Sequence, residues 1–140
     1  MNKEQEILLI KSFFVKRVQE RVLHELFSPK KRDQALYRLD HLYKNMLKNE
    51  YLIEITPPNS WHEDIYDLLK QHGAPDTCYC LSENEVINGK ELPLKEALEH
   101  AVGFGFSSII SCIPGELAYF EAEQSFGAPP RYLLKKPTYH

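Results

Sequence analysis

Two short runs of strand-forming residues, joined by Pro114-Gly115, constrain the fold more than any other stretch of this chain. They lie within residues 107–123, and the proline–glycine pair between them predicts a β-hairpin. In the second run Leu117, Tyr119 and Glu121 point to one side, because side chains alternate along a strand. The first run, residues 109–113, is apolar on both sides. We therefore expect it to lie in the centre of a sheet.

The first 48 residues predict two helices. Residues 3–27 are expected to form one long helix, with an apolar stripe of Ile7, Ile10, Phe14, Val18 and Val22, widened by Leu8, Val15 and Leu26. Ser28-Pro29 then predicts a second helix that runs to about Leu47, with serine as the N-cap and proline at the first helical position. We expect these helices to pack as an antiparallel pair.

The remaining chain alternates between predicted strands and helices. Strands are expected at residues 51–55, 77–82 and 131–135, and a tight turn at Asn88-Gly89. Helices are expected from a capping box at Ser60–Glu63, with Trp61 facing inward, and again from Pro93 to Gly103. The chain is thus predicted to be an α+β protein: an N-terminal helical pair, then a mainly antiparallel sheet of about four strands covered by helices on one face. We expect one domain over residues 1–140, with a helical part at 1–48 and an α+β part at 49–140.

Apolar runs and cysteines bear on where the protein resides. The longest apolar run near the start, Ile7–Ile10, is far shorter than the ~20 residues that span a bilayer. It is also too short for the apolar segment of a signal peptide. Three cysteines are too few for a secreted disulfide framework. We expect a soluble cytoplasmic protein with reduced thiols and no contact with a membrane.

Charge is distributed unevenly along the chain. Residues 1–48 carry 11 basic and 6 acidic side chains, a net charge of +5, whereas the rest carries −8. Lys30, Lys31 and Arg32 are adjacent at the start of the second predicted helix, where the helix dipole disfavours cations. A phosphate partner would offset that cost, which makes these three residues candidates for binding nucleic acid. The alternative is a solvated helix corner balanced by Asp33 and the acidic half of the chain.

Three cysteines form a second candidate. Cys78 and Cys80 face the same side of a predicted strand, and Cys112 lies on a strand that could be adjacent. With His72 or His100 they could form a soft metal site. Their spacing does not match that of structural zinc pairs, and free cysteine usually packs as a small apolar residue. We therefore favour core packing, and predict no metal and no cofactor.

The end of the predicted sheet offers a third candidate. Tyr119, Glu121, Arg131 and Tyr132, with His140 in the tail, bring together groups that could perform general acid–base chemistry on a phosphodiester. A cross-strand pair of Glu121 and Arg131 on the surface would explain the same residues without catalysis.

Function is then inferred mainly from what the sequence lacks. It contains no recognisable cofactor loop, metal spacing or cluster of titratable side chains, so catalysis is not expected. We favour a non-catalytic protein-interaction or regulatory module whose partner is another protein or a second copy, with Trp61, Tyr66 and Tyr119 as anchors. The alternative is a nucleic-acid-binding protein, with ribonuclease activity as an extension, that uses the basic N-terminal helices.

Overall fold

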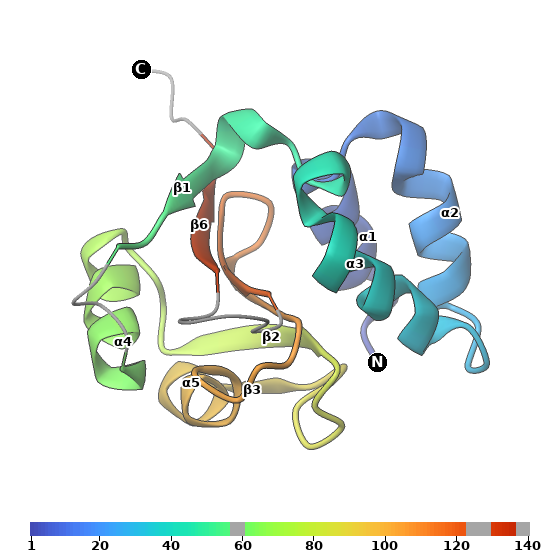
Figure 1. Ribbon diagram of the computed structural model, residues 1–140. Helices are drawn as coiled ribbons and strands as arrows, with labels where there is room; N and C mark the ends of the chain where they lie inside the picture. Colours follow the sequence, from blue (N-terminus) through green and yellow to red (C-terminus); the bar gives the residue numbers. More distant parts are fainter. Residues whose placement is uncertain (57–60, 123–129, 137–140) are drawn as a thin grey trace.

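The structure is a computed structural model and describes residues 1–56, 61–122 and 130–136. Its strands form one antiparallel sheet of six strands in the order β1-β6-β5-β4-β2-β3 (Figure 1). The strands are β1 (Leu52–Glu54), β2 (Thr77–Ser82), β3 (Glu91–Pro93), β4 (Ser108–Ile113), β5 (Leu117–Glu121) and β6 (Arg131–Lys135). The predicted α+β class and antiparallel sheet are confirmed, but the sheet has six strands rather than about four.

The predicted hairpin is present and lies near the centre of the sheet. In β4 and β5, Ile109 pairs with Phe120 and Ile110 with Tyr119, while β4 pairs on its other edge with β2. The connection turns at Gly115, whose φ of +75° belongs to the left-handed region that glycine adopts readily. The central position of β4 explains why both of its faces are apolar.

Helices cover both faces of this sheet, not one as the sequence predicted. Leu81, Ile109 and Phe120 pack on the side of α1, α2 and α3, whereas Ile110 and Tyr119 belong to a second core with α4 and α5. Figure 1 shows the two groups of helices on opposite sides of the strands. Because successive strand residues face opposite sides, a strand buried on both faces requires cover on both.

The long helix expected over residues 3–27 is two helices, α1 (Lys3–Phe13) and α2 (Lys16–Leu26). The chain leaves the helical conformation at Phe14, which forms an isolated antiparallel bridge with Leu47. Val15 donates its backbone N–H to the carbonyl of Met46 at 2.8 Å. This pairing supplies partners for backbone groups that a continuous helix would have satisfied internally, and it buries Phe14 almost completely.

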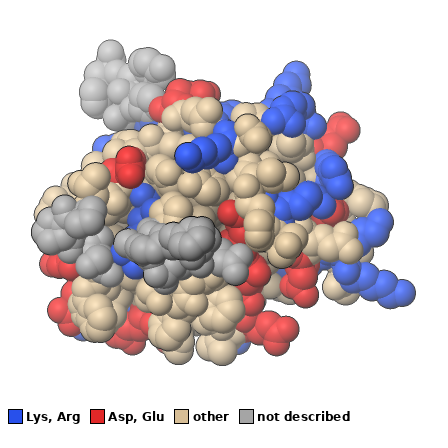
Figure 2. Space-filling view, viewed as in Figure 1, with Lys and Arg blue, Asp and Glu red and all other residues tan. Residues whose placement is uncertain are grey.

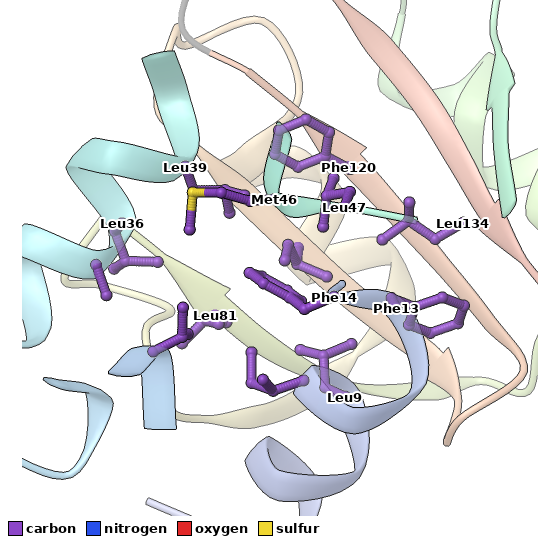
Figure 3. Close-up of a cluster of buried hydrophobic side chains, with 14 of the residues drawn as sticks. Leu9, Phe13, Phe14, Leu36, Leu39, Met46, Leu47, Leu81, Phe120 and Leu134 are labelled. Atoms are coloured by element: carbon purple, nitrogen blue, oxygen red, sulfur yellow. The ribbon is translucent and has the colours of Figure 1, made fainter. Parts of the chain in front are cut away.

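The break changes which face of the first helix is buried. Leu9, Ile10 and Phe13 are in the core, whereas Leu8, which the sequence placed on the apolar stripe, is 43% exposed. Figure 3 shows Leu9, Phe13 and Phe14 pointing toward side chains from α3 and from the sheet. The remaining labelled members of this core are Leu36, Leu39, Met46, Leu47, Leu81, Phe120 and Leu134.

The second helix begins later than predicted. Residues 28–31 form a turn, in which Lys31 and Arg32 both donate backbone N–H groups to the carbonyl of Ser28, and α3 runs from Arg32 to Met46. Within α3, Leu42 has non-helical dihedral angles (φ −124°, ψ 19°), which mark a kink. A short 3₁₀ helix, η1 (Asn49–Tyr51), then leads into β1.

Two further helices cover the other face. They are α4 (His62–Gln71) and α5 (Leu94–Ala101). At the start of α4 the carboxylate of Asp64 accepts the Trp61 backbone N–H at 3.3 Å, and Ser60 of the predicted capping box lies outside the described residues. Trp61 is 61% exposed, so its predicted inward orientation is wrong. No helix within the described ranges is long and apolar enough to cross a membrane.

Candidate functional site

A buried ion pair joins the N-terminal helices to the sheet. Glu6 on α1 accepts two hydrogen bonds from the Arg32 guanidinium, both with N–O distances of 2.7 Å, and each side chain is at least 94% buried. The Tyr79 hydroxyl on β2 also donates to Glu6. Arg32 donates further to the carbonyl of Leu26 at 3.0 Å and to Asn88 at 3.2 Å. These contacts link α1, the start of α3, β2 and the loop before β3.

The electrostatics of this cluster favour its charged form. Burial alone would lower the pKa of Arg32, but the hydrogen bonds and negative charge of Glu6 outweigh burial and raise it. Burial, together with the bond to Glu6, raises the pKa of Tyr79 to about 12. At neutral pH Arg32 is thus a charged guanidinium and Tyr79 a neutral phenol, and both are hydrogen-bonded to Glu6.

This cluster changes the interpretation of the basic triplet. The Arg32 side chain is directed into the protein, whereas Lys30 and Lys31 are exposed in the turn between α2 and α3. Of the three candidates for nucleic-acid contact, the structure leaves two on the surface.

The third candidate group is partly assembled, but its members are buried. Glu121, at the end of β5, accepts from Arg131 Nε at 2.8 Å, from the Tyr119 hydroxyl at 2.9 Å and from the backbone N–H of Gly103. Tyr119 and Glu121 are fully buried and Arg131 is 7% exposed, so the predicted surface location of these three is wrong. Burial, followed by the negative charge of Glu121, raises the pKa of Tyr119 well above its ordinary value.

Tyr132 lies apart from these groups. It is on the opposite face of the sheet, where its hydroxyl is 3.4 Å from that of Tyr43 and its ring stacks against Phe120. His140 falls outside the described residues. The Glu121 carboxylate accepts hydrogen bonds from three donor groups and is covered by protein, which holds the end of β5 against the start of β6. These buried groups offer no open acid–base pair.

All three cysteines are free, buried and part of the core beneath α4 and α5. Within the described part of the chain, no group of three or more His, Cys, Asp or Glu side chains is placed to hold a metal ion. The three cysteines belong to one core cluster, which the sequence alone could not establish.

Of the three proposed aromatic anchors, Tyr119 is fully buried, Tyr66 is half-buried and Trp61 is exposed. A cavity of about 250 Å³ between α4 and α5 is lined by His62, Glu63, Tyr66, Asp67 and Lys95. Trp61 stacks against His62 at its edge, with ring centroids 5.1 Å apart. The side chains that line this cavity are exposed or half-buried.

A groove lies between α2 and α3. It has a volume of about 140 Å³. Its floor is apolar, with Val18 and Val22 from α2 facing Leu42 and Met46 from α3. On α2, Val18 and Val22 are four positions apart, which places them one turn apart on the same face. On α3, Leu42 lies at the kink, four positions before Met46. Leu42, at the kink of α3, is 46% exposed.

Three arginines border this groove: Arg17, Arg21 and Arg38. Arg38 donates two hydrogen bonds to Glu25, and Arg21 lies 3.7 Å from the same carboxylate. Burial, followed by the positive charge of Arg21, lowers the pKa of Arg38. Figure 2 shows Lys and Arg side chains gathered on the side of α2 and α3, while Asp and Glu border the lower edge near α4 and α5. Glu25 pairs with two of the three arginines, and the residues that line the groove include no Asp or Glu, so the lining carries a net positive charge.

The sequence alone did not predict this groove, because residues 3–27 were expected to form one helix and the basic residues of the two helices were considered separately. A usable signal was present: Val18 and Val22 flank Arg21, and Leu42 and Met46 follow Arg38, with four positions between the members of each apolar pair. Recognising it required knowing that α2 and α3 lie side by side.

No protein-family model, curated protein or solved structure matches this chain. The class is therefore defined by its own architecture: an α+β protein whose antiparallel sheet is enclosed by three N-terminal helices on one face and two helices on the other.

Proposed function

We propose that this protein is a non-catalytic interaction module and that the groove between α2 and α3 binds an acidic, amphipathic helical segment of a partner protein. The observation that carries the proposal is the combination of a four-residue apolar floor with an arginine border. A third helix can insert apolar side chains between Val18, Val22, Leu42 and Met46, which is the helix-in-groove mode of recognition.

Charge determines the kind of helix that fits. Arg17 donates to the carbonyl of Asn45 at 2.7 Å and retains other donors, and the Arg21 side chain is 71% exposed. A partner with Glu or Asp beside its apolar stripe would pair with these groups and reduce the repulsion between Arg21 and Arg38. Complementary charge of this kind increases the association rate and selects against basic partners.

A direct test uses three synthetic helical peptides and fluorescence anisotropy. The first has leucines at positions i, i+4 and i+7 with glutamates elsewhere; the second replaces the glutamates by lysines; the third replaces the leucines by serines. We expect binding of the first peptide alone, weakened by added salt because the arginines are partly exposed. Equal binding of the serine peptide would show attraction by charge alone, and absence of binding by the first would refute the proposal.

Nucleic-acid binding is the second candidate, and the exposure of Lys30 and Lys31 beside a positively charged helical layer favours it. This function predicts binding to mixed single- and double-stranded nucleic acid at low salt that falls by orders of magnitude as salt rises. Lys30→Glu with Lys31→Glu should then abolish binding and leave the fold intact. The apolar floor of the groove favours a protein partner, because a phosphate backbone presents no apolar stripe to fill it.

A second copy of this chain is another candidate partner for the groove between α2 and α3. Sedimentation analysis distinguishes this outcome, since a groove occupied by another copy would make the protein associate in a concentration- and salt-dependent manner.

A further inference from the structure

Three thiols lie together on the face of the sheet that α4 and α5 cover. Cys78 and Cys80 are two positions apart on β2, and Cys112 is on the neighbouring strand β4. All three are buried in the same core. The ordinary role of such residues is packing, so a further role depends on how the sulfur atoms are placed relative to one another.

The paired register of β2 and β4 ends at Tyr79 and Ser111, and Cys78 and Cys112 are the next residue on each strand beyond it. Glu83 donates its backbone N–H to Ser107 at 3.0 Å, which makes the odd-numbered positions of β2 the hydrogen-bonded pairs. Even-numbered positions are then the closer pairs, where Cα atoms are about 4.5 Å apart.

This separation suits a disulfide, whose Cα atoms are usually about 4.4–6.8 Å apart. A pair further along the same strands shows the close approach directly, because the hydroxyl oxygens of Ser82 and Ser108 are 2.7 Å apart. Cys112 is also the extra residue of the irregularity between β4 and β5, so its backbone is not fixed by pairing with β5.

Cys80 is less suited to the same bond. Two positions along one strand span about 6.6 Å, and the Cys78 and Cys80 side chains interact across this spacing by a hydrogen bond. Disulfides need Cβ atoms about 3.5–4.5 Å apart. A bond between Cys78 and Cys80 would therefore require the strand to distort. A bond across the two strands requires side-chain rotation, because Cys78 Sγ donates to the Leu92 carbonyl at 3.5 Å and Cys112 Sγ to the Ile110 carbonyl at 3.6 Å.

A cavity of about 160 Å³ gives small molecules a route to this pair. It is lined by both Cys78 and Cys112, together with Ser111, Thr77 and Glu91. A water molecule occupies about 30 Å³ in the liquid, so a peroxide of similar size fits. Burial, with the neighbouring Cys78 next in importance, raises the pKa of Cys112, so Cys112 is suited to react second.

We propose that Cys78 and Cys112 are a thiol modification site at which a small peroxide produces an intramolecular disulfide between β2 and β4. The Cys78 thiolate attacks one oxygen of hydrogen peroxide, the O–O bond breaks, and the departing hydroxide takes a proton to become water. The Cys112 sulfur then displaces the hydroxyl group of the Cys78 sulfenic acid, and this group leaves as a second water with the Cys112 proton. Two thiols and one peroxide thus give one disulfide and two waters, with two electrons passing from sulfur to oxygen.

The test treats the reduced, folded protein with millimolar hydrogen peroxide, removes the peroxide with catalase, and alkylates remaining thiols after denaturation. We expect intact mass to show one alkyl group in place of three, and peptide mapping to show residues 78 and 112 joined by a bond that dithiothreitol reverses. Three alkylated thiols after treatment, a bond that includes Cys80, or bonds formed only between molecules would each overturn the proposal.

Two variants provide matched controls. Cys80→Ser should keep the disulfide, whereas Cys112→Ser should prevent it and leave Cys78 as a sulfenic or sulfinic acid. If Cys112→Ser fails to fold, peptide mapping of the wild-type protein still decides the result. The oxidised protein should also have a higher Tm than the reduced one, because the bond restricts the unfolded chain.

Discussion

The carboxylate of Glu6 and the guanidinium of Arg32 form a bidentate ion pair with two N–O distances of 2.7 Å, and protein covers both groups. The two residues are 26 positions apart in the chain, and Tyr79, which also bonds to Glu6, lies 73 positions from it. A charge this deeply buried is tolerated only when it is paired and hydrogen-bonded. The pair therefore fixes how α1 and α3 meet each other and the sheet.

Replacing Glu6 by glutamine should destabilise the protein by ~3 kcal/mol, because it leaves the buried Arg32 charge without a counter-charge. Urea denaturation measures this loss as a lower midpoint with an unchanged slope. Glu4→Gln, on the exposed side of the same helix, is the control and should change stability by less than ~0.5 kcal/mol. Equal effects of the two substitutions would contradict the role assigned to Glu6.

Removing the whole cluster should cost less than breaking it. Glu6→Leu, Arg32→Met and Tyr79→Phe together remove the charges and the phenol that depends on them, and apolar groups of similar volume often replace a buried ion pair without loss. We expect the triple variant to be more stable than Glu6→Gln alone. A triple variant that is less stable than Glu6→Gln would show that the polar cluster stabilises the fold more than apolar side chains of similar volume do.

Glu121→Gln should also destabilise the protein, by ~3 kcal/mol, because Arg131 would lose its buried counter-charge. Glu116→Gln, in the exposed turn before β5, provides a comparison of the same chemistry in solvent. Thermal unfolding of both variants measures the difference. Since Glu121 also holds the backbone of Gly103, hydrogen exchange should increase in the loop that follows α5.

Stability should fall as the solution is acidified through the titration of His72. Burial, followed by the positive charge of Lys135, lowers the pKa of His72, and Lys135 Nζ lies 2.9 Å from its Nδ1. A group whose folded pKa lies below its unfolded value of about 6.5 stabilises the fold above that pH, and this contribution is lost as the pH falls through the folded pKa.

His72→Gln should therefore have a flatter dependence of unfolding free energy on pH between about 7 and 5 than the wild-type protein, because it removes this proton uptake. His24→Gln, on the exposed side of α2, is the control and should retain the wild-type dependence. Parallel curves for His72→Gln and the wild-type protein would contradict the assignment.

In the groove, Leu42→Ser should weaken binding of the acidic peptide about tenfold, equivalent to ~1.4 kcal/mol, by removing an exposed part of the apolar floor. Leu8→Ser provides a matched control, because Leu8 is 43% exposed compared with 46% for Leu42 and lies outside the groove lining. Anisotropy titrations should show normal affinity for Leu8→Ser. Equal losses of affinity in Leu42→Ser and Leu8→Ser would show that the peptide binds outside the groove.

Arg21→Glu should likewise reduce the affinity for the acidic peptide and reduce its dependence on salt, since it reverses a charge on the border of the groove. Lys30→Glu reverses an exposed charge outside the groove lining and should have a smaller effect. A larger effect at Lys30 would move the binding surface to the turn between α2 and α3 and would favour the nucleic-acid alternative.

Local signals predicted much of the β structure. The hairpin around Gly115 and the strands at residues 77–82 and 131–135 appear where the alternation of side chains and the turn residues indicated them. Alternation and turn chemistry depend on neighbours in the chain, so they can be recognised without the tertiary structure. The helix that begins after Pro93 was predictable for the same reason.

The break at Phe14 was not predictable in this way. Helical periodicity continues through it, and what ends the helix is a backbone bridge to Leu47, 33 positions later. Partners supplied by distant backbone cannot be identified from local pattern. The sequence also placed Leu8 on the apolar stripe, whereas Leu8 is 43% exposed.

The amino-acid sequence by itself determined an α+β chain with a central hairpin, apolar on both sides of its first strand, and with a basic first third. Tertiary structure alone decided that Arg32 is buried beside Glu6 while Lys30 and Lys31 remain exposed, and that Arg21 and Arg38 border one groove. It also decided that Cys78 and Cys112, on the adjacent strands β2 and β4, line one cavity. The physical reason is that strand and turn signals act over a few residues, whereas burial and pairing of charges and thiols depend on which distant elements the fold brings into contact.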